Sequence, residues 1–275
     1  MRGRYREALF KVPGSVFNQQ RKGASWWVSS RYRWRCRRWC CSARVVAVTA
    51  RRWPTPRPSS NGTPCAQPGQ TPVVVYVATR SNGQGNYCSG TLISPTRILT
   101  AAHCLPPDVT RINTAVWQPD GTARALRATR WVTHPEYQVT PTGFLNDAAV
   151  ITLSAPLPAT PMPLLASNPS TPGQDVFIAG WGGPDYELVA GFSRITIVNE
   201  LHVGYTYDGR GANTCPGDSG GPMLRSVGGT QGVVGITSSG TSADCNVGDR
   251  SLFTNIQTPK VLDFIRANAP DAAVI

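Results

Sequence analysis

Residues 215–222 read Cys-Pro-Gly-Asp-Ser-Gly-Gly-Pro, the most informative segment of the chain. Its only hydroxyl belongs to Ser219, which lies among three glycines, and glycine lets a backbone approach other groups closely. A run of this kind is often only a loop. A serine becomes a nucleophile where a base accepts its proton, a carboxylate orients that base, and donors bind the oxyanion. The segment predicts chemistry only if the chain also supplies those partners.

Two further segments supply candidates. Residues 99–104 read Leu-Thr-Ala-Ala-His-Cys, and residues 146–150 read Asn-Asp-Ala-Ala-Val. Taken singly, such a histidine is usually a surface or core residue, and such an aspartate is usually a turn residue. Taken together and in this order, His103, Asp147 and Ser219 form a candidate triad.

The chain has two other histidines, and neither has a matching motif. His134 precedes a proline in a predicted turn, and His202 lies in no recognisable pattern. We expect both to be structural or solvated.

The three segments and their order resemble the trypsin/chymotrypsin family of serine proteases. Further matches lie at residues 87–93, 179–182, 235–240 and 252–254, so the resemblance covers residues 59–268. The interval between Trp181 and Ser219 is shorter than in many animal members, which resembles a compact microbial member. The resemblance implies an all-β fold of two six-stranded antiparallel barrels with the site between them, closed by a short C-terminal helix.

The resemblance also implies a role for each triad residue, following the family template. Ser219 is the nucleophile, and His103 is the general base and then the general acid. Asp147 holds the imidazole tautomer. The backbone N–H groups of Gly217 and Ser219 form the oxyanion hole.

By resemblance, the floor of the substrate pocket is Asn213, six residues before the nucleophile. An amide there carries no charge to pair with arginine or lysine, which argues against strong tryptic specificity. The other pocket residues implied by the resemblance are Thr214, Ser238, Ser239, Gly240 and Ser251. A small polar pocket follows, without a predicted side-chain preference.

Cysteines give separate support. The resemblance implies disulfides between Cys88 and Cys104 and between Cys215 and Cys245, which belong in an oxidising compartment. Free thiols or a zinc site are the alternatives, but the domain has no Cys-x-x-Cys pair, so we expect no metal. Cys65 is left over: it pairs with a cysteine of the first segment (Cys36, Cys40 or Cys41) or stays free.

Composition agrees with a loop-rich β protein, because charged residues are only 15% of the chain and it holds 27 glycines and 24 prolines. Ten short β-branched or aromatic runs separated by turn residues predict strands. They cover residues 73–78, 90–93, 97–100, 127–133, 148–153, 175–179, 194–198, 222–224, 232–237 and 251–255. Residues 259–267 have the spacing of an amphipathic terminal helix.

The net charge of +12 comes from residues 1–58, which hold 15 of the 27 basic residues and one of the 15 acids and so carry +14, while the rest of the chain carries −2. This segment has neither strand nor helix periodicity and no recognisable signal peptide. We interpret it as a disordered basic pro-segment or as a wrongly assigned start of the coding sequence. Residues 59–275 form the predicted protease domain.

Activation is where the chain departs from the family. Members usually free an isoleucine or valine amine that pairs with the acid before the nucleophile, here Asp218. Counting back from Cys88 places that start near Ser59, where neither residue is present. Either processing differs or the N-terminus is wrongly represented.

The sequence therefore predicts a secreted, monomeric serine endopeptidase that acts on protein or peptide substrates and needs no cofactor. A proteinaceous inhibitor is a further implied partner. No apolar run approaches the roughly 18 residues that cross a bilayer, so we expect no membrane contact. The alternative is a catalytically silent trypsin-fold binding protein. Nucleic-acid binding by the basic segment is a weaker alternative, and a lipase is disfavoured because its order is serine, acid, histidine.

Overall fold

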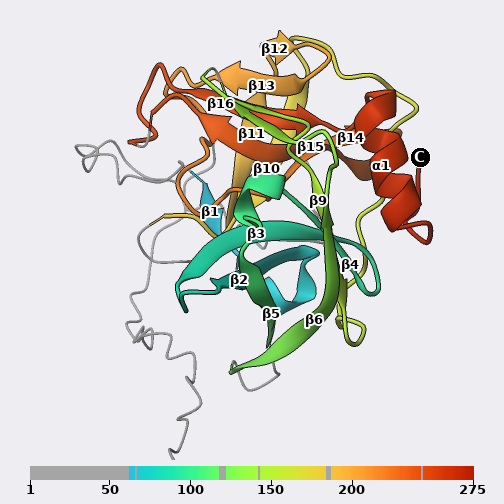
Figure 1. Ribbon diagram of the computed structural model, residues 1–275. Helices are drawn as coiled ribbons and strands as arrows, with labels where there is room; N and C mark the ends of the chain where they lie inside the picture. The colour runs from blue at the N-terminus through green and yellow to red at the C-terminus, as the bar shows by residue number, and fades with distance from the viewer. Residues whose placement is uncertain (1–61, 66, 118–121, 142, 184–186, 243) are drawn as a thin grey trace, which may run out of the picture.

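The computed structural model describes residues 62–275, apart from 66, 118–121, 142, 184–186 and 243. The predictions for residues 1–58, and for a partner of Cys65 among Cys36, Cys40 and Cys41, lie outside the described residues. Within them the chain forms two β-structures, one above the other in Figure 1, with a single α-helix at one side.

Residues 73–153 form a closed six-stranded barrel. Antiparallel neighbours follow the order β2 (Val73–Arg80), β3 (Gly85–Ser94), β4 (Arg97–Thr100), β9 (Ala149–Leu153), β6 (Ala123–Thr133) and β5 (Val109–Trp117). Side chains alternate between the barrel interior and the outside, as the two-residue period of a strand requires. The interior is filled by fully buried aliphatic side chains such as Leu92, Ile98, Leu99, Ile112 and Ile151.

Residues 175–255 supply most of the second structure, an eight-stranded sheet. Its order is β1 (Thr63–Pro64), β11 (Val189–Arg194), β10 (Asp175–Gly180), β14 (Pro222–Val227), β15 (Thr230–Gly240), β16 (Arg250–Asn255), β13 (His202–Thr206) and β12 (Ile197–Val198). The six inner strands match the expected number. Within the described residues this sheet is open, because no ladder joins its two edges, whereas the resemblance implies a second closed barrel.

Short elements complete the fold. They are the 3-10 helices η1 (Pro68–Gln70) and η2 (Ala102–Cys104) and the hairpin of β7 (Gln138–Thr140) with β8 (Gly143–Leu145). The predicted terminal helix is confirmed as α1 (Pro259–Asn268), with Val261, Leu262, Phe264 and Ile265 buried.

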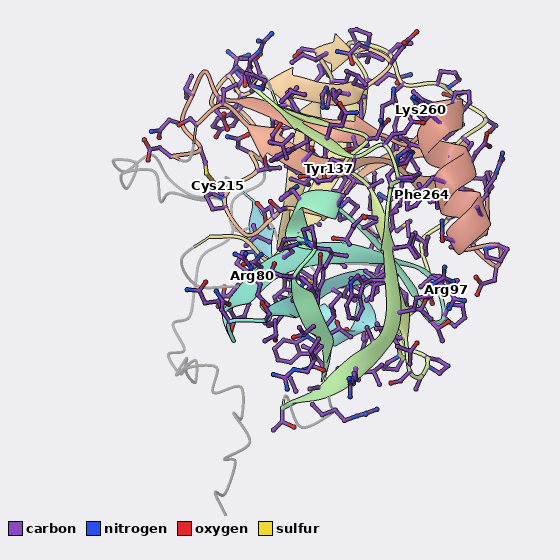
Figure 2. The ribbon with its side chains drawn as sticks, viewed as in Figure 1. Arg80, Arg97, Tyr137, Cys215, Lys260 and Phe264 are labelled. Atoms are coloured by element: carbon purple, nitrogen blue, oxygen red, sulfur yellow. A yellow bond between two sulfur atoms is a disulfide. The ribbon has the colours of Figure 1, made fainter. Side chains whose placement is uncertain are left out.

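Helix α1 packs against the turn that follows β6. Phe264 lies against the ring of His134, with ring centroids 4.9 Å apart, and Lys260 pairs with Glu136 at 2.6 Å. Figure 2 labels both helix residues, Lys260 and Phe264. The helix is also too short to span a bilayer, and no other helix of the described residues is long and apolar enough to do so.

The all-β class is confirmed, and each of the ten predicted segments coincides with a strand, with one correction. Residues 194–198 are not one strand: β11 ends at Arg194, and β12 begins at Ile197. Strands β1, β5, β7, β8, β13 and most of β11 were not expected. Polar residues interrupt the apolar pattern of β5, β11 and β13, and β1, β7 and β8 have only two or three residues each.

Candidate active site

The loop 215–221 is folded tightly on itself. Asp218 N donates to Cys215 O at 3.0 Å, and Gly221 N donates to Asp218 O at 2.8 Å. Gly217 and Gly220 have φ angles of 99° and 81°, a region that residues with a side chain rarely adopt. These two glycines therefore allow the turn that presents Ser219.

Contacts with the first barrel hold this loop in place. Ser89 of β3 donates from its backbone N to Ser219 O at 2.8 Å and from its hydroxyl to Gly217 O at 2.9 Å. A Cβ atom on Gly220 would overlap Thr100 Oγ1 and Ser89 O, so only glycine fits there. Ser219 is thereby held beside the end of β4. This strand ends at Thr100, three residues before His103.

His103 and Asp147 form a double contact. His103 N donates to Asp147 Oδ1 at 2.8 Å, and His103 Nδ1 lies 2.7 Å from Asp147 Oδ2. Because a carboxylate oxygen only accepts, Nδ1 carries the proton, which leaves Nε2 of a neutral ring unprotonated. The pair presents the tautomer that a general base needs.

The second sheet fixes Asp147 from the opposite side. Ser238 Oγ of β15 donates to Asp147 Oδ2 at 2.6 Å, and Thr254 Oγ1 of β16 donates to Asp147 O at 3.0 Å. Asn146, immediately before it, has a φ angle of 49°, which turns the chain into β9. The carboxylate is fully buried and is bound by groups from both halves of the molecule.

Two residues lie near the site that the sequence did not predict there. Phe144 of β8 stacks on His103, with ring centroids 4.9 Å apart and planes at 14°. His202 of β13 donates from Nε2 to Phe144 O at 3.1 Å. No local motif marks either residue, because their relation to the site arises only when the β7–β8 hairpin meets the second sheet.

His134 and His202 are both buried, so they are structural and not solvated. Burial is the main cause that lowers the pKa of each imidazole, so both favour the neutral form.

The structure does not join Ser219 to His103. Among the described residues, no hydrogen bond links the Ser219 hydroxyl to His103 Nε2, although such bonds are often long before substrate binds. The backbone N–H groups of Gly217 and Ser219 donate to no atom of the described residues, whereas those of Asp218 and Gly220 are both bonded. These two amides remain available to an external acceptor.

The residues expected to line the substrate pocket fall into two groups. Asn213, Thr214 and Ser251 form one buried hydrogen-bonded cluster, with Ser251 Oγ 2.7 Å from both Asn213 Oδ1 and Thr214 Oγ1. Ser238 binds Asp147, and Ser239 and Gly240 follow it along β15, where Gly240 pairs with Ser251 of β16.

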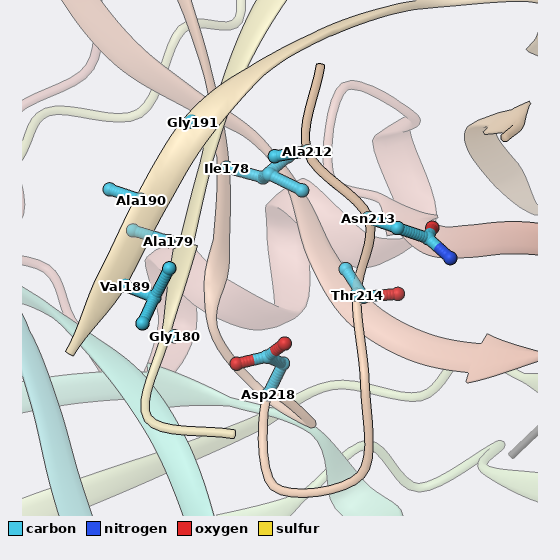
Figure 3. A pocket seen from close by; sticks show the side chains of 10 residues that line it. All are labelled: Ile178, Ala179, Gly180, Val189, Ala190, Gly191, Ala212, Asn213, Thr214 and Asp218. Carbon is cyan, nitrogen blue, oxygen red and sulfur yellow. The ribbon is translucent and has the colours of Figure 1, made fainter. Parts of the chain in front are cut away.

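Asp218 lies on the other side of the same segment, in a cavity that is also lined by Gly180, Ala190 and Ala212 (Figure 3). Its carboxylate accepts hydrogen bonds from Gly182 N at 2.7 Å and Cys215 N at 2.9 Å. Burial outweighs these bonds and raises the pKa of Asp218 to about 6. Within the described residues, no cation pairs with it.

Disulfides join Cys88 to Cys104 and Cys215 to Cys245, the pairs that the resemblance implies. Cys65 donates from its backbone N to Leu188 O at 2.8 Å. In the described part of the chain, the one cluster of potential metal ligands combines His103 with Cys88 and Cys104. Those two sulfurs are bonded to each other, so they offer no thiolate to a metal.

An all-β pair of lobes with a histidine–aspartate pair beside a glycine-flanked serine defines the class of trypsin-fold proteins. Residues 60–265 match the family model described as Trypsin, and the chain belongs to this family. Its relatives include a trypsin of Saccharopolyspora erythraea, 29% identical over 192 residues, with 62% of this chain and 81% of the relative covered.

Two other relatives show the range of the family. Brachyurin of Leptuca pugilator is 32% identical over 197 residues, covering 62% of this chain and 83% of the relative. Glucanase inhibitor protein 3 of Phytophthora infestans is 27% identical over 206 residues, covering 66% and 78%. The name of the last protein describes an inhibitor, so family membership alone does not establish proteolysis.

Proposed function

We propose that this protein is a secreted serine endopeptidase that hydrolyses peptide bonds through an acyl-enzyme. The observation that carries the proposal is the His103–Asp147 pair, together with a serine loop in which two amides donate to no atom of the described residues. Trypsin and brachyurin among the relatives support the same reaction class.

In the proposed reaction, Ser219 Oγ attacks the carbonyl carbon while His103 Nε2 takes its proton. Asp147 accepts the Nδ1–H bond throughout and stabilises the imidazolium. Gly217 N and Ser219 N donate to the oxyanion, and His103 then gives its proton to the leaving amine as the peptide bond breaks. A water molecule repeats the sequence on the acyl-enzyme, releasing the acid and restoring Ser219.

The two disulfides favour an oxidising compartment, and hence secretion. They close the segment that carries His103 and the segment that carries Ser219, so reduction removes constraints from both. The protein or peptide substrates proposed for the site agree with this location.

Asp218 supports a proposal for activation. The described chain begins at Gly62, which lies beside Gly191 on the wall of the Asp218 cavity. We propose that cleavage near Ser59 frees an amine that pairs with this carboxylate. A cation there would favour the ionised form of Asp218 and lower its pKa.

The alternative is a silent binding protein of the same fold. Two observations favour keeping it: Ser219 and His103 are not hydrogen-bonded, and Asp218 has no cationic partner among the described residues. Both are also expected of an enzyme precursor that is not yet activated.

The test is the intact mass of the secreted protein with and without a serine-directed fluorophosphonate. We expect one adduct on the processed protein and none on Ser219→Ala, while Ser226→Ala, a control serine on an exposed part of β14, still gains it. The unlabelled mass also gives the mature start. A folded, processed protein that gains no adduct would favour the silent binding protein.

A further inference from the structure

A second buried carboxylate, that of Asp249, lies behind the proposed floor of the substrate pocket, and the proposed mechanism does not use it. Asp249 is 3% exposed and lies next to the start of β16. Its Oδ1 accepts from Thr241 N at 2.9 Å, Thr241 Oγ1 at 3.0 Å and Ser242 N at 2.9 Å, and its Oδ2 accepts from Asn213 Nδ2 at 3.2 Å. Every one of these partners donates, as an ionised carboxylate requires.

Asp249 fixes which way the amide of Asn213 faces. Asn213 Nδ2 donates both to Asp249 Oδ2 and to Cys245 O, the latter at 3.1 Å. Turning the amide over would place its oxygen against two other oxygens, which have no proton to offer. Asn213 Oδ1 must therefore face Ser251.

The hydroxyl protons beyond Asn213 then have only one arrangement. The amide oxygen only accepts, so Ser251 donates its single proton to Asn213 Oδ1 at 2.7 Å. Ser251 Oγ is then the acceptor at its other contact, and Thr214 Oγ1, 2.7 Å away, must donate. The hydroxyl proton of Thr214 is used in this hydrogen bond, so Thr214 Oγ1 can only accept from any further group.

Asn213 and Thr214 also line the Asp218 cavity, but their side chains point away from its carboxylate. Figure 3 shows both side chains on the opposite side of their segment from the Asp218 carboxylate. Thr214 is 9% exposed, whereas Asn213 and Ser251 are at 1% and 0%, so Thr214 is the member that a ligand meets first.

We infer that Asp249 sets the polarity of the pocket through Asn213, Ser251 and Thr214, and selects substrates whose side chain before the cleaved bond ends in a hydrogen-bond donor. Amide, ammonium, guanidinium and hydroxyl groups belong to this class. The inference rests on the proposed protease function. A side chain that ends in an acceptor would place its lone pairs against those of Thr214 Oγ1, where no hydrogen bond can form. It would also lose its hydrogen bonds to water.

The negative charge of Asp249 also favours a substrate side chain that ends in a donor. Asp249 has no cationic partner among the residues that the structure describes, and each bond of the chain polarises the next. Asp249 touches no substrate in this arrangement and is a positioning residue, while Thr214 makes the contact.

The experiment compares two neutral peptides that differ only before the cleaved bond, one with glutamine and one with its methyl ketone analogue, in which a methyl group replaces the terminal NH2. The ketone has nearly the shape of glutamine but no donor. We expect kcat/KM to favour glutamine by about tenfold or more, the effect of one hydrogen bond against an unpaired polar group.

Asp249→Asn tests the relay itself. Its Nδ2 would face Asn213 Nδ2, so the Asn213 amide loses one of the two acceptors that hold it and keeps only Cys245 O. In the molecules whose amide turns over, Ser251 donates to Thr214, and the proton of Thr214 becomes free to donate. We expect the glutamine preference to fall. The matched control, Thr241→Val, removes one donor to the same carboxylate without changing its charge, and should keep the preference within about twofold.

A second pair of variants covers the case in which Asp249→Asn does not fold. Thr214→Val removes the terminal acceptor and should abolish the preference, whereas Thr214→Ser should keep it. Fluorophosphonate labelling counts the active enzyme in every preparation. Equal cleavage of the two peptides by the unaltered enzyme, or an unchanged preference in Asp249→Asn or Thr214→Val, overturns the relay and leaves the protease proposal standing. Absence of both labelling and cleavage overturns both.

Discussion

Asp147 and Asp218 are both buried carboxylates, but their partners differ. Asp147 accepts three hydrogen bonds, two from His103 and one from Ser238, and its imidazole partner can become a cation. Asp218 accepts only two, both from neutral backbone amides, and burial raises its pKa to about 6.

The difference shows that a buried carboxylate does not by itself have a complete set of hydrogen-bonding and charged partners. Asp147 has its set of partners in the chain as described, whereas Asp218 has a cavity beside it and no charge to balance its own. Under the proposed function, Asp147 orients His103 for the reaction, and Asp218 pairs with an amine only after the chain has been cleaved.

The largest expected effect is that of Asp147→Asn. An amide in place of the carboxylate favours the wrong tautomer of His103, and in the family template that change lowers kcat by about 10⁴-fold. Peptide cleavage, normalised to correctly folded protein, measures it. Asp108→Asn, which removes a part-exposed partner of Arg80, is the control and should retain activity. Comparable turnover in Asp147→Asn would exclude the triad.

Asp218→Asn is expected to act more weakly. The amine proposed to pair with Asp218 would lose its countercharge. Removing one partner of a buried pair costs about 3–5 kcal/mol, which is roughly 10²- to 5 × 10³-fold in the active population. Measuring kcat/KM on the processed enzyme checks this. Asp175→Asn, whose partner is the exposed Arg194, serves as the control. Full activity in Asp218→Asn would mean that Asp218 needs no amine.

The pH dependence of stability separates the two states of Asp218. Burial raises the pKa of this carboxyl from 3.8 to about 6, so the folded chain binds its proton first and gains stability as pH falls from 7 towards 4. The gain is about 3 kcal/mol. Denaturant unfolding of unprocessed Ser219→Ala, with and without Asp218→Asn, measures it as the difference between the two curves.

After processing, the sign should reverse. An amine that pairs with Asp218 lowers the carboxyl pKa, so its stabilisation is present at neutral pH and is lost on acidification. Identical curves for the parent and the Asp218→Asn variant would contradict the raised pKa.

The smallest expected effect concerns Asp147 again. Ser238→Ala removes one hydrogen bond to a charged group and should lower the free energy of unfolding by about 2 kcal/mol. Ser239→Ala, one residue further along β15, is the control and should cost less. Equal losses in the two variants would show that the Ser238 bond adds nothing specific.

The sequence predicted the strands that have continuous apolar runs, such as β2 and β9, because burial on one or both faces is visible as a pattern. It did not predict β5 or β13, whose polar residues obscure the pattern. Helix α1 was predictable from Pro259 at its start and from the spacing of its buried residues.

Some residues of the candidate site could likewise be predicted from the sequence, and others could not. His103, Asp147 and Ser219 lie in short segments that resemble a known family, and the structure hydrogen-bonds the first two. Phe144 and Asp249 could not be predicted, since one lies in an unremarkable hairpin and the other in a turn rich in small residues. Their contacts depend on the packing of distant segments, which local sequence does not encode.

The crossed bonds between the two halves have a consequence for the newly made chain. Ser238 and Thr254 of the second sheet hold Asp147, while Ser89 of the first barrel holds the Ser219 loop. A chain in which only one half has folded lacks one of these clamps, so neither half by itself positions a complete site. Under the proposed function, the two halves must therefore dock before the chain can cleave any peptide, its own included.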